Sequence, residues 1–215
     1  MKKLVIIGAG DFGREIFGHA RLSEGYMTFF ELKGYIDDVM YENPSSEQYS
    51  HIPLPLINSI NNYQPETDDV FICAIGNPSG RKIVVNKMLE RGAEFITLKH
   101  QTSIIADTAQ IGSGCFLGPY TCIGPDTVIA DHAMVNTHSA VGHDVKIGKY
   151  SCVMSFVDLT GHTEIGECVF MGSGSRTVPG AKIGSGAYVG LGSVVLRKVK
   201  ENTKVFGNPA VRVEV

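Results

Sequence analysis

The sequence predicts a chain in two parts, an α/β domain of about half a Rossmann fold followed by a parallel β-helix. Over residues 1–100, short apolar runs alternate with helix-like segments, which is the order of βαβ units on a parallel sheet. From Ile105 onward an aliphatic residue recurs at every sixth position, a period that fits neither an α-helix nor an ordinary strand. This period is typical of hexapeptide repeats, whose short strands stack into a prism.

These patterns divide the chain into three regions. We expect a Rossmann-like βαβαβ domain that binds a nucleotide over residues 1–100, the hexapeptide β-helix over residues 101–196, and a C-terminal tail over residues 197–215.

A glycine-rich turn joins the first predicted strand, KKLVIIGA, to the first predicted helix, DFGREIFGHARLSEG. Gly8, Gly10 and Gly13 form the pattern G-x-G-x-x-G, whose backbone N–H groups and helix dipole can hold a phosphate. Alone, this pattern is a weak signal. The next predicted strand, FFELKGYIDD, ends on Asp37 and Asp38, which either bind a ribose or sugar hydroxyl or simply form a turn.

The rest of the first domain contains further strand-like and helix-like segments, DVFICAIGN, SGRKIVVNKMLERG and AEFITL. Between Asp38 and Asp68 the sequence is rich in proline, serine and asparagine. We expect a loop with little regular structure there.

The hexapeptide repeat continues from Ile105 to Val195, and the residue after the aliphatic position is often glycine. If the aliphatic side chains point inward, the two residues after the glycine position lie at exposed corners. The six-residue steps are Ile105, Ile111, Leu117, Ile123, Ile129, Val135, Val141, Ile147, Val153, Leu159, Ile165, Met171, Thr177, Ile183, Val189 and Val195, of which only Thr177 is not aliphatic.

Composition excludes several classes of protein. The formal net charge is −3, and no basic run is long enough to follow a nucleic-acid backbone. The five cysteines lack C-x-x-C spacing, which favours reduced thiols over a disulfide framework or a zinc cluster. The N-terminal apolar run is followed at once by charged residues, unlike a signal peptide or a membrane span. We therefore expect a cytoplasmic protein.

Several short motifs accompany the repeat: YIDD at Tyr35 to Asp38, AIGN at Ala74 to Asn77, and GNPA at Gly207 to Ala210. With these motifs, nearly the whole chain resembles the sialic acid O-acetyltransferase (NeuD/PglD-like) family, which includes N-acetyltransferases of nucleotide-linked 4-amino sugars used in bacterial surface glycans. The resemblance implies a left-handed β-helix with three hexapeptides per coil, acetyl-CoA as co-substrate and no metal. It also implies a homotrimer that holds the donor in a cleft between two subunits.

The resemblance also assigns roles to residues. His143, in the segment GHD, corresponds to the general base, and Asp144 to its acidic partner; an imidazole can accept the proton of an attacking amine or hydroxyl. Cys152 stands where some members have a second histidine that contacts the acetyl group. By matching positions, the acetyl-CoA contacts are Cys152, Gly161, Ser173 and Lys182, and the acceptor contacts are Gly10, Asp11, Phe12, Asp37, Asp38 and Asn77.

Coils of 18 residues place Gly161 beside His143, where it would leave room for an acyl group, and place Asp144 beside His162. The pairing of Asp144 with His162 is either functional or a plain surface ion pair. We interpret His132 and His138 as solvent-exposed residues at corners of the prism and not as site residues.

Three alternatives remain open from the sequence. An NAD-dependent oxidoreductase would explain the glycine pattern, but about 100 residues give only half of a dinucleotide site. A non-catalytic scaffold or nucleotide-sugar-binding protein would not need His143 with Asp144. A zinc enzyme would need His138, His143 and His162 to converge. The sequence names neither the sugar nor its nucleotide, and it does not separate N-acetylation from O-acetylation, as by a sialic acid O-acetyltransferase.

Overall fold

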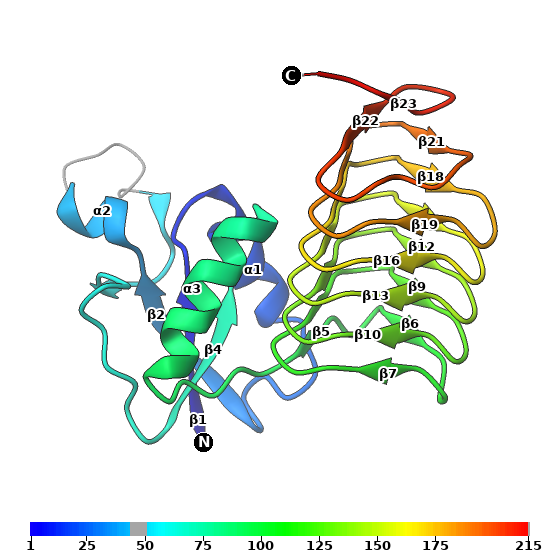
Figure 1. The fold of residues 1–215 in the computed structure, drawn as a ribbon. Helices are drawn as coiled ribbons and strands as arrows, with labels where there is room; N and C mark the ends of the chain where they lie inside the picture. Colours follow the sequence, from blue (N-terminus) through cyan, green and yellow to red (C-terminus); the bar gives the residue numbers. More distant parts are fainter. Residues whose placement is uncertain (44–50, 215) are drawn as a thin grey trace.

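The computed structural model describes residues 1–43 and 51–214, which form an α/β domain and a three-sided β-prism side by side (Figure 1). The predicted fold class is confirmed. The α/β domain is a parallel sheet in the order β3-β2-β1-β4. Its elements are β1 (Lys2–Ile7), α1 (Asp11–Ala20), β2 (Phe30–Ile36), α2 (Asp38–Glu42), β3 (Leu56–Asn58), β4 (Asp69–Cys73) and α3 (Pro78–Glu90).

The sheet forms because β1 and β4 are apolar on both faces. Alternate side chains of β1 enter two cores: Leu4 and Ile6 pack toward α1, and Val5 and Ile7 pack toward α3. The segment predicted as an irregular loop contains α2 and β3. Residues 44–50 of that segment lie outside the described residues.

The prism has three faces, each a parallel sheet whose neighbouring strands lie 18 residues apart in sequence. We call them the docked, second and third faces. The docked face contains β5 (Leu98–Lys99), β8 (Phe116–Leu117), β11 (Met134–Val135), β14 (Cys152–Val153), β17 (Phe170–Met171), β20 (Tyr188–Val189), β22 (Lys204–Phe206) and the antiparallel β23 (Val211–Arg212).

The second face contains β6 (Ile104–Ile105), β9 (Cys122–Ile123), β12 (Ala140–Val141), β15 (Asp158–Leu159), β18 (Arg176–Thr177) and β21 (Val194–Val195). The third face contains β7 (Gln110–Ile111), β10 (Val128–Ile129), β13 (Lys146–Ile147), β16 (Glu164–Ile165) and β19 (Lys182–Ile183).

The predicted tail is part of the prism. Strand β22 pairs in parallel with β20, its Val205 side chain is buried, and β23 folds back antiparallel to it. The prism also begins at β5, slightly before the boundary at residue 101.

The inward positions of the repeat form the core of the prism, as the six-residue period predicts. Val135, Val141 and Val153 have at most 2% of their surface exposed. The polar exception, Thr177, is also buried, and its hydroxyl is within hydrogen-bonding distance of the Thr163 hydroxyl at 3.0 Å. Because this hydroxyl has a polar partner, the core tolerates it.

The second corner residue of each repeat adopts a left-handed backbone conformation. From Gly114 to Gly192, every sixth residue has φ between +55° and +72°. Glycine, aspartate and histidine tolerate this conformation better than most residues do. The positive φ values therefore recur with the period of the repeat. The non-glycine residues that have a positive φ in this series are Tyr120, Asp126, His132, His138, Asp144, Tyr150, Phe156, His162 and Cys168.

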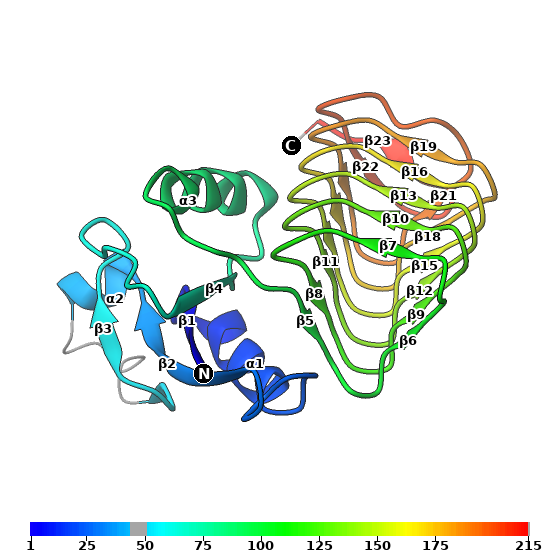
Figure 2. The ribbon, with the colours of Figure 1, turned by 90° about the horizontal axis from the view of Figure 1, so that it is seen from below.

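The three corners of the prism have different surroundings. The corner between the third and docked faces, the near edge, contains Tyr150. The corner between the docked and second faces, the side edge, contains His138. The corner between the second and third faces, the far edge, contains His143. Figure 2 shows that the far edge lies on the side of the prism away from the α/β domain.

The α/β domain packs on the docked face and the near edge. Phe116, Met134 and Cys152 project from the docked face into the core beside α1 and are fully buried. Arg81 of α3 is also fully buried, and it donates hydrogen bonds to the backbone carbonyl oxygens of Ile75 (3.1 Å) and His132 (3.3 Å). Removing this side chain would leave buried carbonyls unpaired, so Arg81 fixes α3 against the prism.

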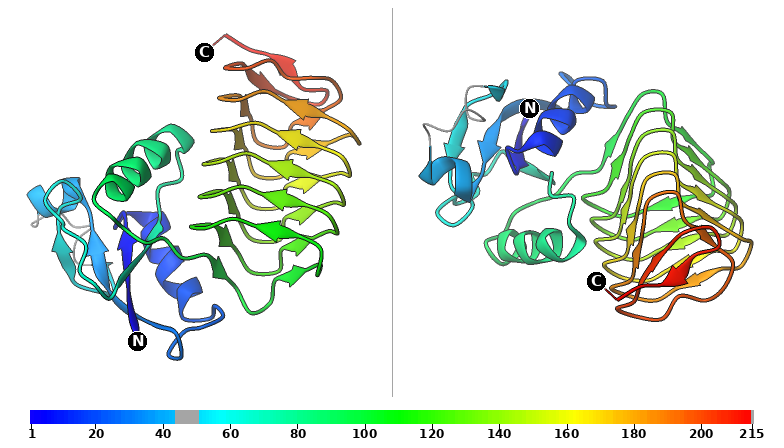
Figure 3. Two further views of the ribbon diagram at one scale, coloured as in Figure 1. Left: turned by 60° about the horizontal axis from the view of Figure 1, so that its bottom comes forward. Right: turned by 90° about the horizontal axis from the view of Figure 1, so that it is seen from above.

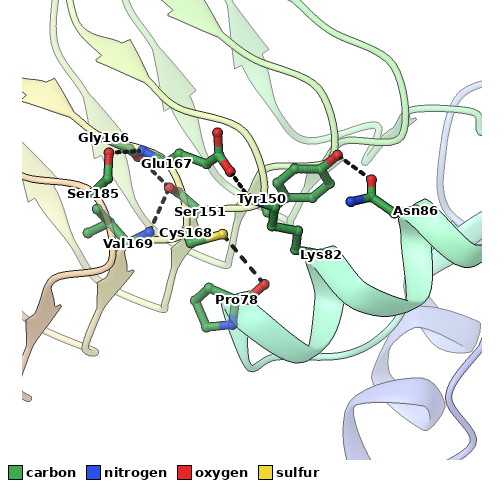
Figure 4. Close-up of polar contacts among 10 residues, drawn as sticks. All are labelled: Pro78, Lys82, Asn86, Tyr150, Ser151, Gly166, Glu167, Cys168, Val169 and Ser185. Carbon is green, nitrogen blue, oxygen red and sulfur yellow. Dashed lines mark hydrogen bonds and ion pairs between the residues drawn. The ribbon is translucent and has the colours of Figure 1, made fainter. Parts of the chain in front are cut away.

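Polar contacts extend this interface along α3 (Figure 4). Lys82 forms an ion pair with Glu167 at 2.5 Å, and the Tyr150 hydroxyl donates to Asn86 Oδ1 at 2.8 Å. The two domains therefore form a continuous unit (Figure 3). No helix among the described residues is long and apolar enough to cross a membrane.

His132 corrects one prediction. We expected a solvated corner, but the near edge is covered, and only 5% of His132 is exposed. Its ring stacks on Tyr150 at 5.5 Å between centroids and meets Phe95 edge-on at 4.9 Å. Burial lowers the pKa of His132 to about 4.

This burial makes stability depend on pH. An unfolded chain protonates histidine below about pH 6.5, whereas folded His132 stays neutral until about pH 4. In that window the unfolded state binds more protons, so stability falls as the pH is lowered. We predict that the free energy of unfolding in urea falls less between pH 7 and pH 4 in His132→Asn than in the wild type. His138→Asn, at the same corner position on the side edge, should keep the wild-type slope; equal slopes in all three proteins would contradict the prediction.

Candidate active site

His143 and Asp144 form a hydrogen-bonded pair on the far edge. His143 Nδ1 lies 2.8 Å from Asp144 Oδ2, and because a carboxylate only accepts, the imidazole is the donor. This assigns the proton of the neutral ring to Nδ1 and leaves Nε2 as the acceptor. Both side chains are about half exposed, so a substrate can reach them.

The prism backbone positions the pair. Asp144 has φ +57° and donates its backbone N–H to the Pro125 carbonyl at 3.0 Å. The His143 carbonyl accepts from the His162 backbone N–H at 3.0 Å. The hydrogen bond from His143 lowers the pKa of the Asp144 carboxyl, which keeps Asp144 ionised at neutral pH.

Gly161 lies directly under the imidazole of His143. A Cβ at Gly161 would be 2.5 Å from His143 Nε2 and 2.6 Å from its Cε1. The space that the sequence assigned to an acyl group is therefore occupied by the His143 ring. Gly161 permits the ring to lie along the edge.

His162 is the second histidine near Asp144. Its Nδ1 is 3.8 Å from Asp144 Oδ2, and its ring meets that of His143 edge-on with centroids 4.9 Å apart. The predicted pairing across one strand spacing is present. In the described part of the chain, one set of histidine, cysteine, aspartate or glutamate side chains has ligand atoms close enough, within 4.8 Å of one another, to hold a metal ion: His143, Asp144 and His162. All three are exposed.

His138 lies on a different edge from His143. It is exposed on the side edge, between Tyr120 and Phe156, with both ring centroids 4.9 Å away. Within one chain, His138 therefore does not converge with His143 and His162, as a zinc site of three histidines would require.

The predicted donor contacts are scattered. Cys152 is fully buried at the domain interface, and burial raises its pKa to about 11, so the expected contact with acetyl-CoA is wrong for this structure. Ser173 is half-buried on the side edge. Lys182 lies on the third face, where it forms an ion pair with Glu164 at 3.1 Å. Of the four, only Gly161 lies against His143.

Two of the predicted acceptor residues line an opening in the α/β domain. Gly10 and Asp11 at the start of α1, with Arg14, Met40 and His51, surround a cavity of about 40 Å³. Gly10 supplies no side-chain cap, so the first N–H groups of α1 are available to a ligand. Sequence reasoning missed Arg14, which lies one turn further along α1, and missed Met40 and His51, which come from other segments of the chain.

The other predicted acceptor residues have structural contacts. Asp37 caps α2 by accepting from the Met40 N–H and also accepts from the Ala9 N–H at 3.0 Å. Asn77 caps α3 by accepting from the Gly80 N–H. Asp38 accepts from the Asn61 N–H, and Phe12 packs edge-on against Phe116. Asp37 therefore shapes the glycine-rich turn, whatever it contacts in a ligand.

Residues 3–88 match the family described as the PglD N-terminal domain. The chain is 30% identical over 212 residues to the GDP-perosamine N-acetyltransferase of Escherichia coli O157:H7, an alignment that covers 95% of this chain and 93% of that protein. The chain belongs to the PglD-like family of acetyltransferases. It is therefore an acyltransferase, and the oxidoreductase alternative is rejected.

Solved structures agree with this assignment. The acetyltransferase domain of PglB from Neisseria gonorrhoeae FA1090, in complex with acetyl coenzyme A, is 26% identical with a TM-score of 0.86 over 99% of both chains. PerB from Caulobacter crescentus, in complex with CoA and GDP-perosamine, has a TM-score of 0.85 at 24% identity and covers 100% of this chain and 98% of its own. At 24% identity, the match to PerB shows that the two proteins share a fold.

Gly161→Ala tests the position of the His143 ring. The new methyl group would displace the flexible His143 ring and leave the backbone unchanged, so we predict a fall in kcat of about 10²-fold with an unaltered melting temperature. Gly18→Ala is the matched control, because a Cβ at Gly18 in α1 meets nothing within 4 Å. Wild-type turnover by Gly161→Ala would show that the ring does not lie over Gly161 during catalysis.

Proposed function

We propose that this chain transfers the acetyl group of acetyl-CoA to the amino group of a nucleotide-linked sugar, with His143 as general base. The observation that carries the proposal is the exposed His143–Asp144 pair, with Nδ1 bonded to the carboxylate and Nε2 free. The family relative from Escherichia coli O157:H7 is a GDP-perosamine N-acetyltransferase, which favours an amino acceptor over a hydroxyl.

The reaction needs a proton acceptor. The sugar nitrogen attacks the thioester carbonyl carbon, and a new C–N bond forms as the C–S bond breaks. His143 Nε2 takes the proton that the nitrogen loses and returns it to the departing sulfur, which leaves as the thiol of CoA. Asp144 holds the ring in the required tautomer and stabilises the transient imidazolium. Acetyl-CoA is consumed as a co-substrate, and no metal takes part.

The acceptor nucleotide belongs at the start of α1. The N-termini of α2 and α3 are capped by their own Asp37 and Asn77 side chains, whereas α1 begins at the uncapped Gly10. A diphosphate bonded to the free N–H groups of α1 would place the nucleoside against the cavity beside Asp11. We place the reaction in the cytoplasm, where free thiols such as the five cysteines persist.

The base and the acceptor domain of one chain lie on opposite sides of the prism. The α/β domain packs on the docked face, whereas His143 lies on the far edge, between the other two faces (Figure 2). A sugar held by α1 therefore faces the far edge of another subunit. A homotrimer with three-fold symmetry would pair each acceptor domain with a neighbour's base.

The direct test is an acetyl-CoA assay with GDP-, UDP- and dTDP-linked 4-amino sugars, with sialic acid as the O-acetylation arm. Thiol release that depends on one amino sugar supports the proposal. Release only with sialic acid would identify a sugar O-acetyltransferase, and no release with any acceptor would favour a non-catalytic scaffold.

Substitution of the pair tests the mechanism. We predict that His143→Ala lowers kcat by roughly 10²- to 10⁴-fold, the usual contribution of a positioned base, and leaves acetyl-CoA binding intact. Asp144→Asn should be less damaging, because an amide can still hold the ring in place but stabilises the transient imidazolium less than a carboxylate does. His138→Ala on the side edge is the control. If His138→Ala loses activity and His143→Ala keeps it, the choice of base is wrong.

A further inference from the structure

Two histidines and one aspartate of the far edge converge across neighbouring coils. Nδ1 of His143 and Nδ1 of His162 both face the same carboxylate oxygen of Asp144, at 2.8 Å and 3.8 Å. The ligand atoms of the three side chains all lie within 4.8 Å of one another. His143 and Asp144 suffice for a general base, so His162 has no role in the proposed mechanism.

The distances between these side chains fit a tetrahedral zinc ion. Zinc binds histidine nitrogen and carboxylate oxygen at about 2.0–2.2 Å, so two of its ligand atoms lie about 3.4 Å apart. The separations of Asp144 Oδ2 from His143 Nδ1 and from His162 Nδ1, 2.8 Å and 3.8 Å, lie on either side of this value. Small rotations of the three exposed side chains would therefore direct all three ligand atoms at one ion.

The prism backbone fixes the positions of these residues. The His162 N–H donates to the His143 carbonyl at 3.0 Å, and the Asp144 N–H donates to the Pro125 carbonyl at 3.0 Å. Because the coils set the spacing, little chain has to be ordered when an ion binds, and such preorganisation favours tight binding. The side chains of His143, Asp144 and His162 are exposed, so an ion in solvent can reach them.

The neighbouring corners of the far edge favour a cation and leave room for it. Asp126 repeats the position of Asp144 one coil earlier, about 4.8 Å along the edge, and is exposed. Its carboxylate adds a second negative charge near the site, which attracts a cation. On the other side, the corner after His162 is Pro179–Gly180, and a Cβ at Gly180 meets nothing within 4 Å. The space on that side of His162 is therefore open.

We propose that His143, Asp144 and His162 bind a zinc ion that inhibits the enzyme. The inhibition rests on the proposed function, because it takes His143 as the general base. A neutral imidazole has one N–H, so a ring that binds zinc through Nδ1 carries its proton on Nε2. Nε2 then has no lone pair to accept the proton of the attacking amine. Zinc therefore acts as an inhibitor and not as a cofactor.

The chemistry of the ligand set selects zinc over harder cations. Imidazole nitrogen suits zinc, whereas Mg²⁺ prefers oxygen ligands in octahedral geometry. Two histidines and one carboxylate also occur together in zinc sites that leave a fourth position to water. We therefore expect zinc to inhibit acetyl transfer at concentrations where Mg²⁺ does not.

His162→Phe removes one ligand atom and keeps an aromatic ring beside His143. The corner should accept phenylalanine, because Phe156 has the same repeat position and the same φ of +59° as His162. We predict that titration calorimetry with zinc chloride shows about 100-fold weaker binding than in the wild type, since loss even of an outer-shell partner weakens metal binding by about 10- to 100-fold. His162→Cys should restore binding, because a thiolate is a zinc ligand and Cys168 occupies the equivalent corner position on the near edge.

The same variants test the inhibition. Zinc should inhibit acetyl transfer by the wild type, and a chelator should reverse the inhibition. The zinc concentration that halves the rate should be about 100-fold higher for His162→Phe, in line with its weaker binding. Each rate is compared with that variant's own rate without zinc. His138→Phe is the matched control: it removes an exposed histidine at the same repeat position on the side edge, and it should bind zinc and be inhibited as the wild type is.

Calorimetry and the transfer assay together separate the zinc site from the proposed function. If the wild type transfers acetyl groups but binds zinc no better than His162→Phe does, the zinc site is overturned and the acetyltransferase function stands. If the wild type binds zinc as predicted but transfers no acetyl group to any acceptor, the zinc site stands and the proposed function fails. Transfer that continues with zinc bound, or that Mg²⁺ inhibits equally, would overturn inhibition by zinc at Nδ1.

Discussion

The backbone hydrogen bonds between coils are the interaction on which the rest of the structure depends. From β5 to β21, paired strands of the prism lie 18 residues apart, so every third repeat returns to the same face and edge. This spacing aligns His143 with Gly161. A slip of one repeat would move His143 to another edge, away from the glycine that admits its ring.

The period of six predicts much of the prism because it reports a local requirement: one inward side chain per short strand. It therefore identifies the buried residues, the exposed corners and the site of His143 and Asp144. It says little about neighbours that come from elsewhere in the chain. His132 and Cys152 have the same repeat positions as exposed residues, but the α/β domain packed on the near edge and the docked face buries them. The sequence predicts Asp37 as a ligand contact. The structure shows that Asp37 also caps α2, a helix that the sequence did not predict.

His143 and the α/β domain lie on opposite sides of one rigid scaffold. The α/β domain is fixed to the docked face by buried apolar side chains and by Arg81, so a large hinge motion between His143 and the α/β domain would expose a substantial core. If α1 binds the acceptor and His143 is the base, as we propose, these two parts of one chain serve different sites, and a trimer would bring each α/β domain to a neighbour's His143.

Subunit complementation tests this shared site most directly. Gly10→Glu would place a carboxylate at the start of α1, where it repels a diphosphate; its Cβ meets nothing within 4 Å, so the fold should tolerate it. His143→Ala removes the base but keeps the acceptor domain. If the site is shared between neighbours in a trimer, equal mixing of the two inactive variants into mixed trimers should restore about one quarter of the wild-type activity. Mixed trimers no more active than the separate variants would contradict the account, because base and acceptor domain would then have to come from the same chain.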